Sequence, residues 1–220
     1  LYSGVSGMTW LSFTTNDGLA NNKVTRIDEA PNGDLWFSHS SFSAGVSVFD
    51  GNNWISYNSP DLPISGVCAI SFSDNGDIWF ASPLDGLAHY DGTNFTNYSS
   101  NDGLLSNYST SVLVDNSNNI WLGSQDGMTV MNSTINQFTF HTIMYSLPPP
   151  DTLNPVTEIA KDSWGRIWTT IYVGYLAEGG VAYWNGSQWF DFDHSDGIAG
   201  PNVKSLAIDS QNNVWIATTT

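Results

Sequence analysis

The chain has 220 residues, with five Lys or Arg against 21 Asp or Glu and a formal net charge of −16. Nucleic acid and anionic membrane surfaces are excluded as partners, because phosphate contacts need clustered basic side chains and the five here are scattered. Hydrophobic residues make up 40% and aromatic residues 14%, which excludes a disordered acidic tail, and no apolar run approaches the ~20 residues of a membrane-spanning helix.

The chain opens with a stretch from Tyr2 to Phe13 that ends in Trp10-Leu-Ser-Phe13. The same kind of ending returns as Trp54-Ile-Ser-Tyr57 and Phe95-Thr-Asn-Tyr98, each time after an Asp-Gly turn. Asp-Gly between alternating apolar runs is a strong signal for a tight β-hairpin. We therefore expect residues 2–13 to be the second half of a repeated unit.

From residue 23 onward, a hydrophobic residue is followed nine positions later by a tryptophan, and this occurs five times. Between the two positions stands a turn rich in Asp, Asn and Gly, such as Pro31-Asn-Gly-Asp34, and these residues tolerate the positive φ of a tight hairpin. Each unit is therefore predicted to open with two antiparallel strands, A and B. The five pairs are Ile27/Trp36, Ile70/Trp79, Val112/Trp121, Ile159/Trp168 and Leu206/Trp215.

A second hairpin, strands C and D, is predicted after each of the first four tryptophans. It is clearest at Gly45–Tyr57, Gly86–Tyr98 and Gly180–Phe192, and looser from Gly127 to about Phe140. Four short strands in each unit, with a tryptophan spacing of 43, 42, 47 and 47 residues, are typical of β-propeller blades. We interpret the recurring tryptophans as blade-packing residues: Trp36, Trp79, Trp121, Trp168 and Trp215.

The sequence thus predicts an all-β fold, a β-propeller of five four-stranded blades in a single domain over residues 1–220. Four blades are expected at about 23–57, 66–98, 108–141 and 155–193. The fifth would be shared by residues of about 1–14 and 202–220, so that strands from both ends close the ring and leave no free sheet edge. A window cut from a longer array of blades would give the same pattern, and this alternative stays open.

The repeat resembles the two-component-regulator propeller repeat in the run Asn16-Asp-Gly-Leu-Ala-Asn-Asn-Lys-Val-Thr-Arg-Ile27 and in Gly33-Asp-Leu-Trp36 after it. Asn101-Asp-Gly-Leu-Leu-Ser-Asn107 and Ser195-Asp-Gly-Ile198 echo its opening, and the resemblance covers essentially the whole chain. It implies a bacterial extracytoplasmic propeller of the kind found in sensor domains of hybrid histidine kinases, often responding to glycans, and in secreted or surface proteins. A fainter similarity to streptogramin-lyase-type propellers brings no catalytic histidine motif with it.

The B–C loops and the D-to-A connections vary in length and share one face, whereas the A–B turns on the opposite face are short and alike. Variable loops on a rigid scaffold are where binding usually lies, so we predict that this face binds the ligand. For each aromatic residue on it, packing of the loop upon itself is the alternative. The predicted ligand-binding residues are His39, Phe42, Asp85, Asp126, Tyr145, Tyr172, Tyr175 and Glu178.

No catalytic residues and no metal site are predicted, because the four histidines lack metal-ligand spacing. The Asp-rich turns leave Ca²⁺ open as a cofactor, although none of them completes a calcium-binding series. Cys68 is the single cysteine and lies in a strand-like run, so we expect a small buried side chain. Loop carboxylates of different blades, such as Asp85, Asp126 and Glu178, could still face one another across the axis as acid and base.

We therefore expect a non-catalytic binding or interaction module for a glycan or a protein, at an extracellular, cell-surface or periplasmic location. Aromatic faces beside Asn and Asp suit a sugar, which offers C–H surfaces and hydroxyl groups. Two alternatives stay open: a carbohydrate-active enzyme (glycosidase or lyase), and a structural propeller of a larger surface assembly. No nucleic acid, no membrane insertion and no required cofactor is expected, and the domain is expected to be part of a larger chain or assembly.

Overall fold

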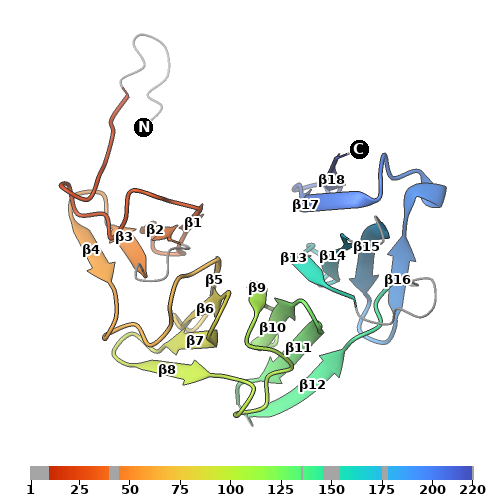
Figure 1. Ribbon diagram of the computed structural model, residues 1–220, viewed down its shortest axis with the longest axis horizontal. Coiled ribbons are helices and arrows are strands. Elements are labelled where there is room, and N and C mark those ends of the chain that lie inside the picture. The colour runs from red at the N-terminus through yellow and green to blue at the C-terminus, as the bar shows by residue number, and fades with distance from the viewer. Residues whose placement is uncertain (1–9, 40–44, 135, 146–153, 175–177, 220) are drawn as a thin grey trace.

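The computed structural model describes residues 10–39, 45–134, 136–145, 154–174 and 178–219, and these residues form antiparallel sheets with one short 3-10 turn, η1 (His194–Asp196). Figure 1 shows five sheets arranged around a common centre, which confirms the all-β propeller. Four sheets have four strands in chain order, and the last has two. The strands are β1 (Arg26–Glu29), β2 (Leu35–Ser38), β3 (Val46–Phe49), β4 (Trp54–Tyr57), β5 (Ala69–Phe72), β6 (Ile78–Ser82), β7 (Gly86–Tyr90), β8 (Phe95–Tyr98), β9 (Ser109–Val114), β10 (Asn119–Ser124), β11 (Gly127–Asn132), β12 (Gln137–His141), β13 (Val156–Lys161), β14 (Ile167–Val173), β15 (Glu178–Trp184), β16 (Trp189–Phe192), β17 (Asn202–Ile208) and β18 (Val214–Thr219).

The Asp-rich turns build the A–B hairpins. The carboxylate of Asp115 accepts the backbone N–H groups of Ser117 and Asn119, which fixes the turn between β9 and β10. In four units the residue six positions before the tryptophan also accepts the indole N–H, so turn chemistry and tryptophan orientation are linked. These pairs are Trp79 Nε1 to Ser73 Oγ (3.2 Å), Trp121 Nε1 to Asp115 (2.9 Å), Trp168 Nε1 to Asp162 (3.0 Å) and Trp215 Nε1 to Asp209 (3.1 Å).

The core lies between neighbouring sheets, where the strand-B tryptophan of one blade packs against the next blade. The ring of Trp36 stacks on Tyr57 of its own sheet, with centroids 6.0 Å apart, and lies 5.7 Å from Phe80 of the second sheet. Trp36, Trp79, Trp121 and Trp168 are 2–7% exposed, as their packing role requires. Trp215 departs from this prediction at 64% exposed, because no sheet follows it among the described residues.

The D-to-A connections are held by internal hydrogen bonds and pack against strand D of the blade that they enter. Asp17 accepts the backbone N–H and the hydroxyl of Thr14, and Asp102 does the same for Ser99. The glycine that follows each aspartate packs closely against an aromatic residue of strand D: Gly18 against Trp54, and Gly103 against Phe138. Both glycines have a φ near +120°, a left-handed region that favours glycine.

Gly103→Ala is expected to destabilise the protein more than Gly76→Ala. Both positions have a positive φ, but a Cβ on Gly103 would lie 2.9 Å from the Phe138 ring, whereas a Cβ on Gly76 meets nothing within 4 Å. The left-handed backbone costs roughly 1–2 kcal/mol in either variant, and overpacking adds about 1–3 kcal/mol at Gly103 alone. Urea unfolding of the two variants measures the difference, and equal losses would contradict the packing role of Gly103.

The five sheets form an arc that stays open between sheet β1–β4 and sheet β17–β18 (Figure 1). The predicted closing blade is therefore present only in part: its C-terminal half is the two-stranded sheet β17–β18. Residues 10–13 form no strand, because they have no neighbouring strand to pair with, and residues 1–9 lie outside the described part of the chain. Closure of the ring by both ends is thus not observed in the described residues.

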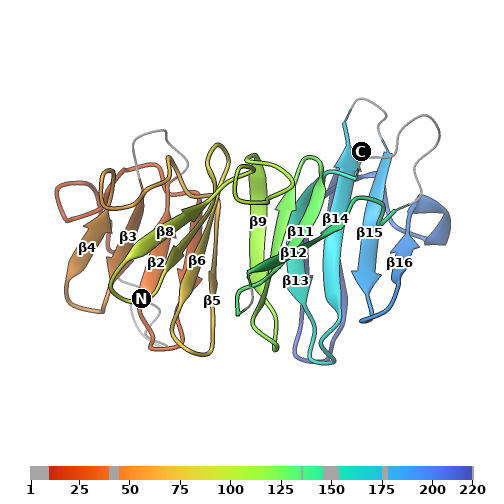
Figure 2. The same ribbon diagram turned by 90° about the horizontal axis from the view of Figure 1, so that it is seen from below.

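Figure 2 shows the blades side-on, with strands running between two faces. The A–B turns lie on one face. The other face contains the open ends of the A–B hairpins, where for example Ser38 pairs with Arg26. We call this the upper face. Those predicted ligand-binding residues that the structure describes belong to this upper face or to the strand ends beside it.

Candidate functional site

The innermost strands, β1, β5, β9, β13 and β17, surround the centre of the arc (Figure 1). In three of them the residue just before the repeated hydrophobic anchor is small, namely Ala69, Ser111 and Ser205. In the other two it is charged and of opposite sign, namely Arg26 on β1 and Glu158 on β13. The centre of the protein therefore carries a pair of charges that the repeat does not require.

Arg26 joins blades that are far apart in the sequence. Its Nε lies 3.1 Å from Asp28 Oδ1 on the same strand, and its Nη1 lies 3.6 Å from Glu158 Oε1 of the fourth blade. The other carboxylate oxygen of Glu158 accepts the Ser205 hydroxyl at 2.6 Å and the Leu206 backbone N–H at 2.9 Å. We call Arg26, Asp28, Glu158 and Ser205 the axial cluster, and it ties the first blade, the fourth blade and the last sheet together.

The axial cluster is partly open to solvent. The Arg26 side chain is 41% exposed, whereas Asp28 and Glu158 are 19% and 20% exposed. Burial raises the pKa of Asp28, and the neighbouring Arg26 guanidinium opposes this shift. Arg26 thus offers guanidinium donors to solvent beside shielded carboxylates, which suits recognition of carboxylate or hydroxyl groups.

Basic side chains gather at the upper end of this centre, in a protein whose net charge is −16. Arg26 begins β1, Lys23 lies three residues before it, and Lys204 lies near the start of β17, so three of the five basic residues lie near the same ends of the innermost strands. Lys204 Nζ lies 4.9 Å from the centre of the Tyr172 ring, a cation–π contact between the last sheet and the fourth blade. The upper centre therefore combines Lys and Arg side chains, beside the carboxylates of Asp28 and Glu158, with a partly exposed aromatic ring.

The predicted residues divide into four groups of two. Tyr172 is half-buried beside Lys204, and Glu178 is exposed at the start of β15, so both lie on the upper face. Asp85 and Asp126 lie in short B–C turns, where Asp85 accepts the Ser65 backbone N–H at 2.6 Å and the Asp126 N–H donates to Ser124. Two further predicted residues, Phe42 and Tyr175, lie outside the described residues.

His39 and Tyr145 correct the prediction, because both side chains are buried. His39 is fully buried, with Nδ1 3.2 Å from the Lys23 carbonyl oxygen and Nε2 2.9 Å from Ser47 Oγ. Tyr145 is 4% exposed and packs in the core of the fourth blade, with its hydroxyl 3.4 Å from Asp193. Both residues support the upper face from below and do not present a surface to a ligand.

The sequence-based prediction did not include the axial cluster. The available signal was positional: the residue before the anchor is small in three strands but charged at Arg26 and Glu158. Because these two residues are 132 positions apart, only the curved arrangement of the blades brings them into contact. Alignment of strand A alone would have identified both residues, although not their pairing.

Stability is expected to fall as the pH drops below about 6.5, because burial lowers the pKa of His39 and of His141 below the usual histidine value. When a histidine has a lower pKa in the folded protein than in the unfolded chain, neutral histidine stabilises the fold fully above the unfolded-state pKa. That stabilisation is lost as the pH falls from the unfolded-state pKa towards the folded-state pKa. Protonated His141 would also lose the hydrogen bond that its Nδ1 accepts from Trp189 Nε1. Urea unfolding at pH 7.5 and pH 5 measures the loss, and a His39→Gln, His141→Gln double variant with an undiminished loss would contradict this assignment.

Within the described ranges, no group of three or more His, Cys, Asp or Glu side chains could hold a metal ion. The Asp-rich turns that left Ca²⁺ open as a cofactor use their carboxylates for their own amide groups. Cys68 is half-buried where a fully buried side chain was expected, and desolvation raises the pKa of its thiol to about 12. In the same described ranges, no helix is long and apolar enough to cross a membrane.

Residues 103–126 and 197–220 match the family model of the two-component regulator propeller. None of the curated proteins matches this sequence. Among solved structures, the extracellular domain of a hybrid two-component system from B. thetaiotaomicron is similar, with a TM-score of 0.73 and 18% identity over 99% of this chain and 29% of that one. The chain thus spans less than a third of that relative's length.

Two further solved structures share the fold. PorZ, a surface component of the type-IX secretion system of Porphyromonas gingivalis, has a TM-score of 0.73 and 15% identity over 96% of this chain and 33% of that one. Virginiamycin B lyase from Staphylococcus aureus has a TM-score of 0.66 and 16% identity over 89% of this chain and 63% of that one. At these identities the similarity supports the fold alone.

Proposed function

We propose that this chain, which carries repeats of the two-component regulator propeller family, is the ligand-recognition part of an extracytoplasmic protein and binds a glycan or a protein segment on its upper face. The observation that carries the proposal is the axial cluster, where Arg26 meets Glu158 across the centre. Neither charge is needed for the repeat, because three of the five units place a small residue at the same position.

The chemistry of the upper centre suits a sugar better than an apolar ligand. Tyr172 offers a ring face for the C–H surface of a sugar, and Arg26 and Lys204 offer donors for hydroxyl or carboxylate groups. An acidic glycan and an acidic protein segment both carry carboxylates that Arg26 and Lys204 could bind, and Asp28 and Glu158 offset part of that positive charge. Of the two, the partly exposed Tyr172 ring beside the donors favours a glycan.

The proposed location and role take their lead from proteins that share this fold. One similar structure is the extracellular domain of a two-component system and another is a bacterial surface component. Because this chain spans about a third or less of each, sensing, signalling and assembly remain proposals for the larger protein to which such a propeller would belong. An extracellular, surface or periplasmic location follows from the same proposal.

Glycan-array binding of the purified chain tests the proposal, with Arg26→Ala and Tyr172→Ala as site variants. We expect a defined set of glycans to bind and both variants to lose most of that signal. Lys161→Ala is the matched control, because Lys161 lies on the innermost strand β13 but bonds Asn116 and Val114 away from Arg26. Loss of binding in the control alone, or full binding in both site variants, would contradict the proposal.

A second function, a carbohydrate-active enzyme, is favoured by one specific observation. Asp28 and Glu158 flank the same guanidinium, so two shielded carboxylates lie at one centre, and burial shifts the pKa of Asp28 upward, the direction that favours a proton donor. Turnover of a bound glycan that is lost in Asp28→Asn, with binding retained, would establish the enzyme. Binding without turnover leaves the recognition module as the function.

A further inference from the structure

We infer that the protein has a second binding site, on the face opposite the upper face, for a small primary ammonium compound that carries a carbonyl oxygen and an apolar body. The site is the cavity between the A–B turns of the first and second blades. It depends on Trp36, whose indole N–H differs from those of the other strand-B tryptophans. The site is separate from the axial cluster and does not depend on the function proposed above.

Trp36 lacks the hydrogen-bond acceptor that the other four strand-B tryptophans have in their own turns. In those units a Ser or Asp side chain six positions before the tryptophan accepts the indole N–H. In the first unit this position is Ala30, whose methyl group cannot accept a hydrogen bond. The Trp36 indole N–H therefore has no hydrogen-bond partner among the described residues, although the residue is only 5% exposed.

The orientation of the Trp36 ring directs this N–H towards Ala30. Trp36 stacks on Tyr57, the last residue of strand D, with an interplanar angle of 4°. Trp121 stacks on the equivalent strand-D residue at 6°, and its Nε1 reaches the side chain six positions earlier. Because the two rings occupy the same place in their blades, Trp36 Nε1 points to the side chain of Ala30. Both residues line the cavity, so this donor is open to a ligand there.

The cavity has a volume of about 300 Å³, which suits a small molecule. Much of its wall is apolar and offers a surface to a hydrocarbon group, since burial of apolar surface is favourable. The apolar lining residues are Ala30, Pro31, Phe72 and Ile78, together with the Trp36 ring. A ligand that fits therefore has a small apolar body and brings an oxygen to the Trp36 N–H.

The charged groups that line the cavity are both carboxylates. Asp34 is half-buried and Asp74 is exposed, and the described lining contains no Lys, Arg or His side chain. Asp34 accepts a hydrogen bond from Asn32 Nδ2 at 2.7 Å, and a carboxylate has room for further donors. An anionic ligand would be repelled here, in a protein of net charge −16, whereas a primary ammonium group would be attracted.

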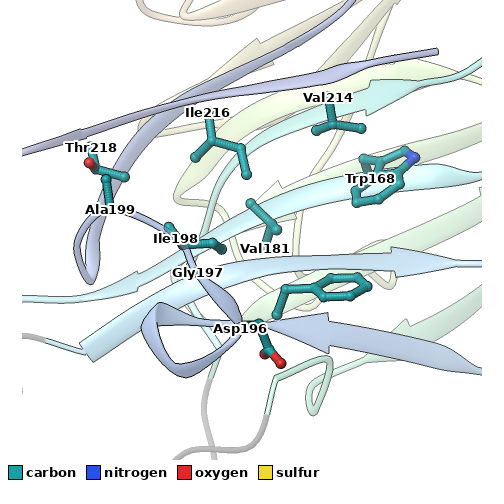
Figure 3. Close-up of a pocket in the computed structure, with 10 residues that line it drawn as sticks. Trp168, Val181, Asp196, Gly197, Ile198, Ala199, Val214, Ile216 and Thr218 are labelled. Atoms are coloured by element: carbon teal, nitrogen blue, oxygen red, sulfur yellow. The ribbon is translucent and has the colours of Figure 1, made fainter.

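A cavity elsewhere in the protein shows why the missing acceptor matters. This cavity, of about 420 Å³, lies between the fourth blade and the last sheet and is also lined by a strand-B tryptophan, Trp168 (Figure 3). Trp168 Nε1 donates to Asp162 at 3.0 Å, so its N–H is already used within the turn. The apolar wall is thus shared by both cavities, whereas the open indole donor belongs to the one beside Trp36.

Nuclear magnetic resonance of the indole N–H groups tests the inference. The probe is leucinamide, which has an ammonium group, a carbonyl oxygen and a short apolar side chain, and Trp36→Phe assigns the Trp36 signal. We expect this signal to shift on titration and to saturate. N-acetyl-leucinamide, which lacks the charge, should bind about tenfold more weakly, the usual difference between a charged and a neutral hydrogen-bonding group.

Ala30→Ser is the site variant, because Ser73 accepts the Trp79 N–H from the equivalent position at 3.2 Å. The new hydroxyl should take up the Trp36 N–H, so that the melting temperature is kept and the affinity for leucinamide falls about tenfold. Asp74→Asn should weaken binding about threefold, because it removes one exposed charge from the lining. The matched control is Asp61→Asn, which removes an exposed carboxylate outside the cavity and should leave the affinity unchanged.

The other outcomes overturn the inference. An unchanged Trp36 signal, or an equal affinity for leucinamide in wild type and Ala30→Ser, would mean that the indole N–H does not hold a ligand and that water alone satisfies it. Equal binding of leucinamide and N-acetyl-leucinamide would exclude the ammonium class. If Ala30→Ser failed to fold, Asp74→Asn and Asp61→Asn would still decide, and equal affinity in these two variants would contradict a site at this cavity.

Discussion

Replacing Trp79 by Ala is expected to lower the free energy of unfolding by about 3–5 kcal/mol, the usual loss for a fully buried tryptophan. Trp79 is 2% exposed, stacks on His89 with centroids 4.2 Å apart and donates its indole N–H to Ser73. Its removal would leave a cavity between the second and third sheets, where it packs with Val112 and Leu122. Urea unfolding of wild type and variant measures the loss.

Trp164→Ala is the matched control for Trp79→Ala. Trp164 lies in the turn between β13 and β14 and is 69% exposed, with Arg166 4.3 Å from its ring centre. An exposed cation–π contact contributes about 0.5–1 kcal/mol, so the control should lose no more than this. A similar loss in both variants would contradict the assignment of the strand-B tryptophans as the residues that hold neighbouring blades together.

Replacing Glu158 by Ala is expected to cost about 2–5 kcal/mol, because it removes a charge-assisted partner from a shielded site. The Leu206 backbone N–H and the Ser205 hydroxyl would lose their acceptor, and Arg26 would keep only Asp28. Leu206 is 6% exposed, so water cannot easily replace the lost carboxylate at its N–H. Thermal or urea unfolding at low and high salt measures the loss and its electrostatic part.

Glu158→Gln separates the hydrogen bonds from the charge. The amide oxygen of Gln can still accept from Leu206 and Ser205, and only the ion pair with the partly exposed Arg26 is lost. We expect this variant to lose less than about 1 kcal/mol, the value of a partly solvated ion pair. If Gln destabilised the protein as much as Ala, the charge and not the hydrogen bonds would hold the axial cluster together.

The regular part of the fold could be predicted from the sequence because it is local. An Asp or Ser six positions before a tryptophan, with Asn and Gly between them, specifies a hairpin within one short segment, and Asp115 with Trp121 shows how. The recurrence of this segment indicates blades, since the units repeat a similar turn followed by a tryptophan. No knowledge of distant contacts is needed for either inference.

The candidate site was predicted only in part because it depends on distant contacts and side-chain direction. Tyr172 and Glu178 lie on the upper face, and their role in binding stays a prediction. His39 has a similar position in the sequence, at the end of strand B, but its ring turns inward to Ser47. Loop position gives no information about that rotation. Arg26 and Glu158 were missed because the pairing of the first and fourth blades exists only once the arc is formed.

The most direct test of the proposed recognition function is a hydrogen–deuterium exchange footprint of the chain with the glycan selected on the array. Ligand binding at the upper centre should slow exchange at residues 23–28, 156–160, 170–174 and 203–206, which carry Lys23, Arg26, Glu158, Tyr172 and Lys204. The A–B turns on the opposite face should exchange as in the free protein. Protection confined to those turns or to the outer strands, with none at the upper centre, would contradict a ligand site built on the axial cluster.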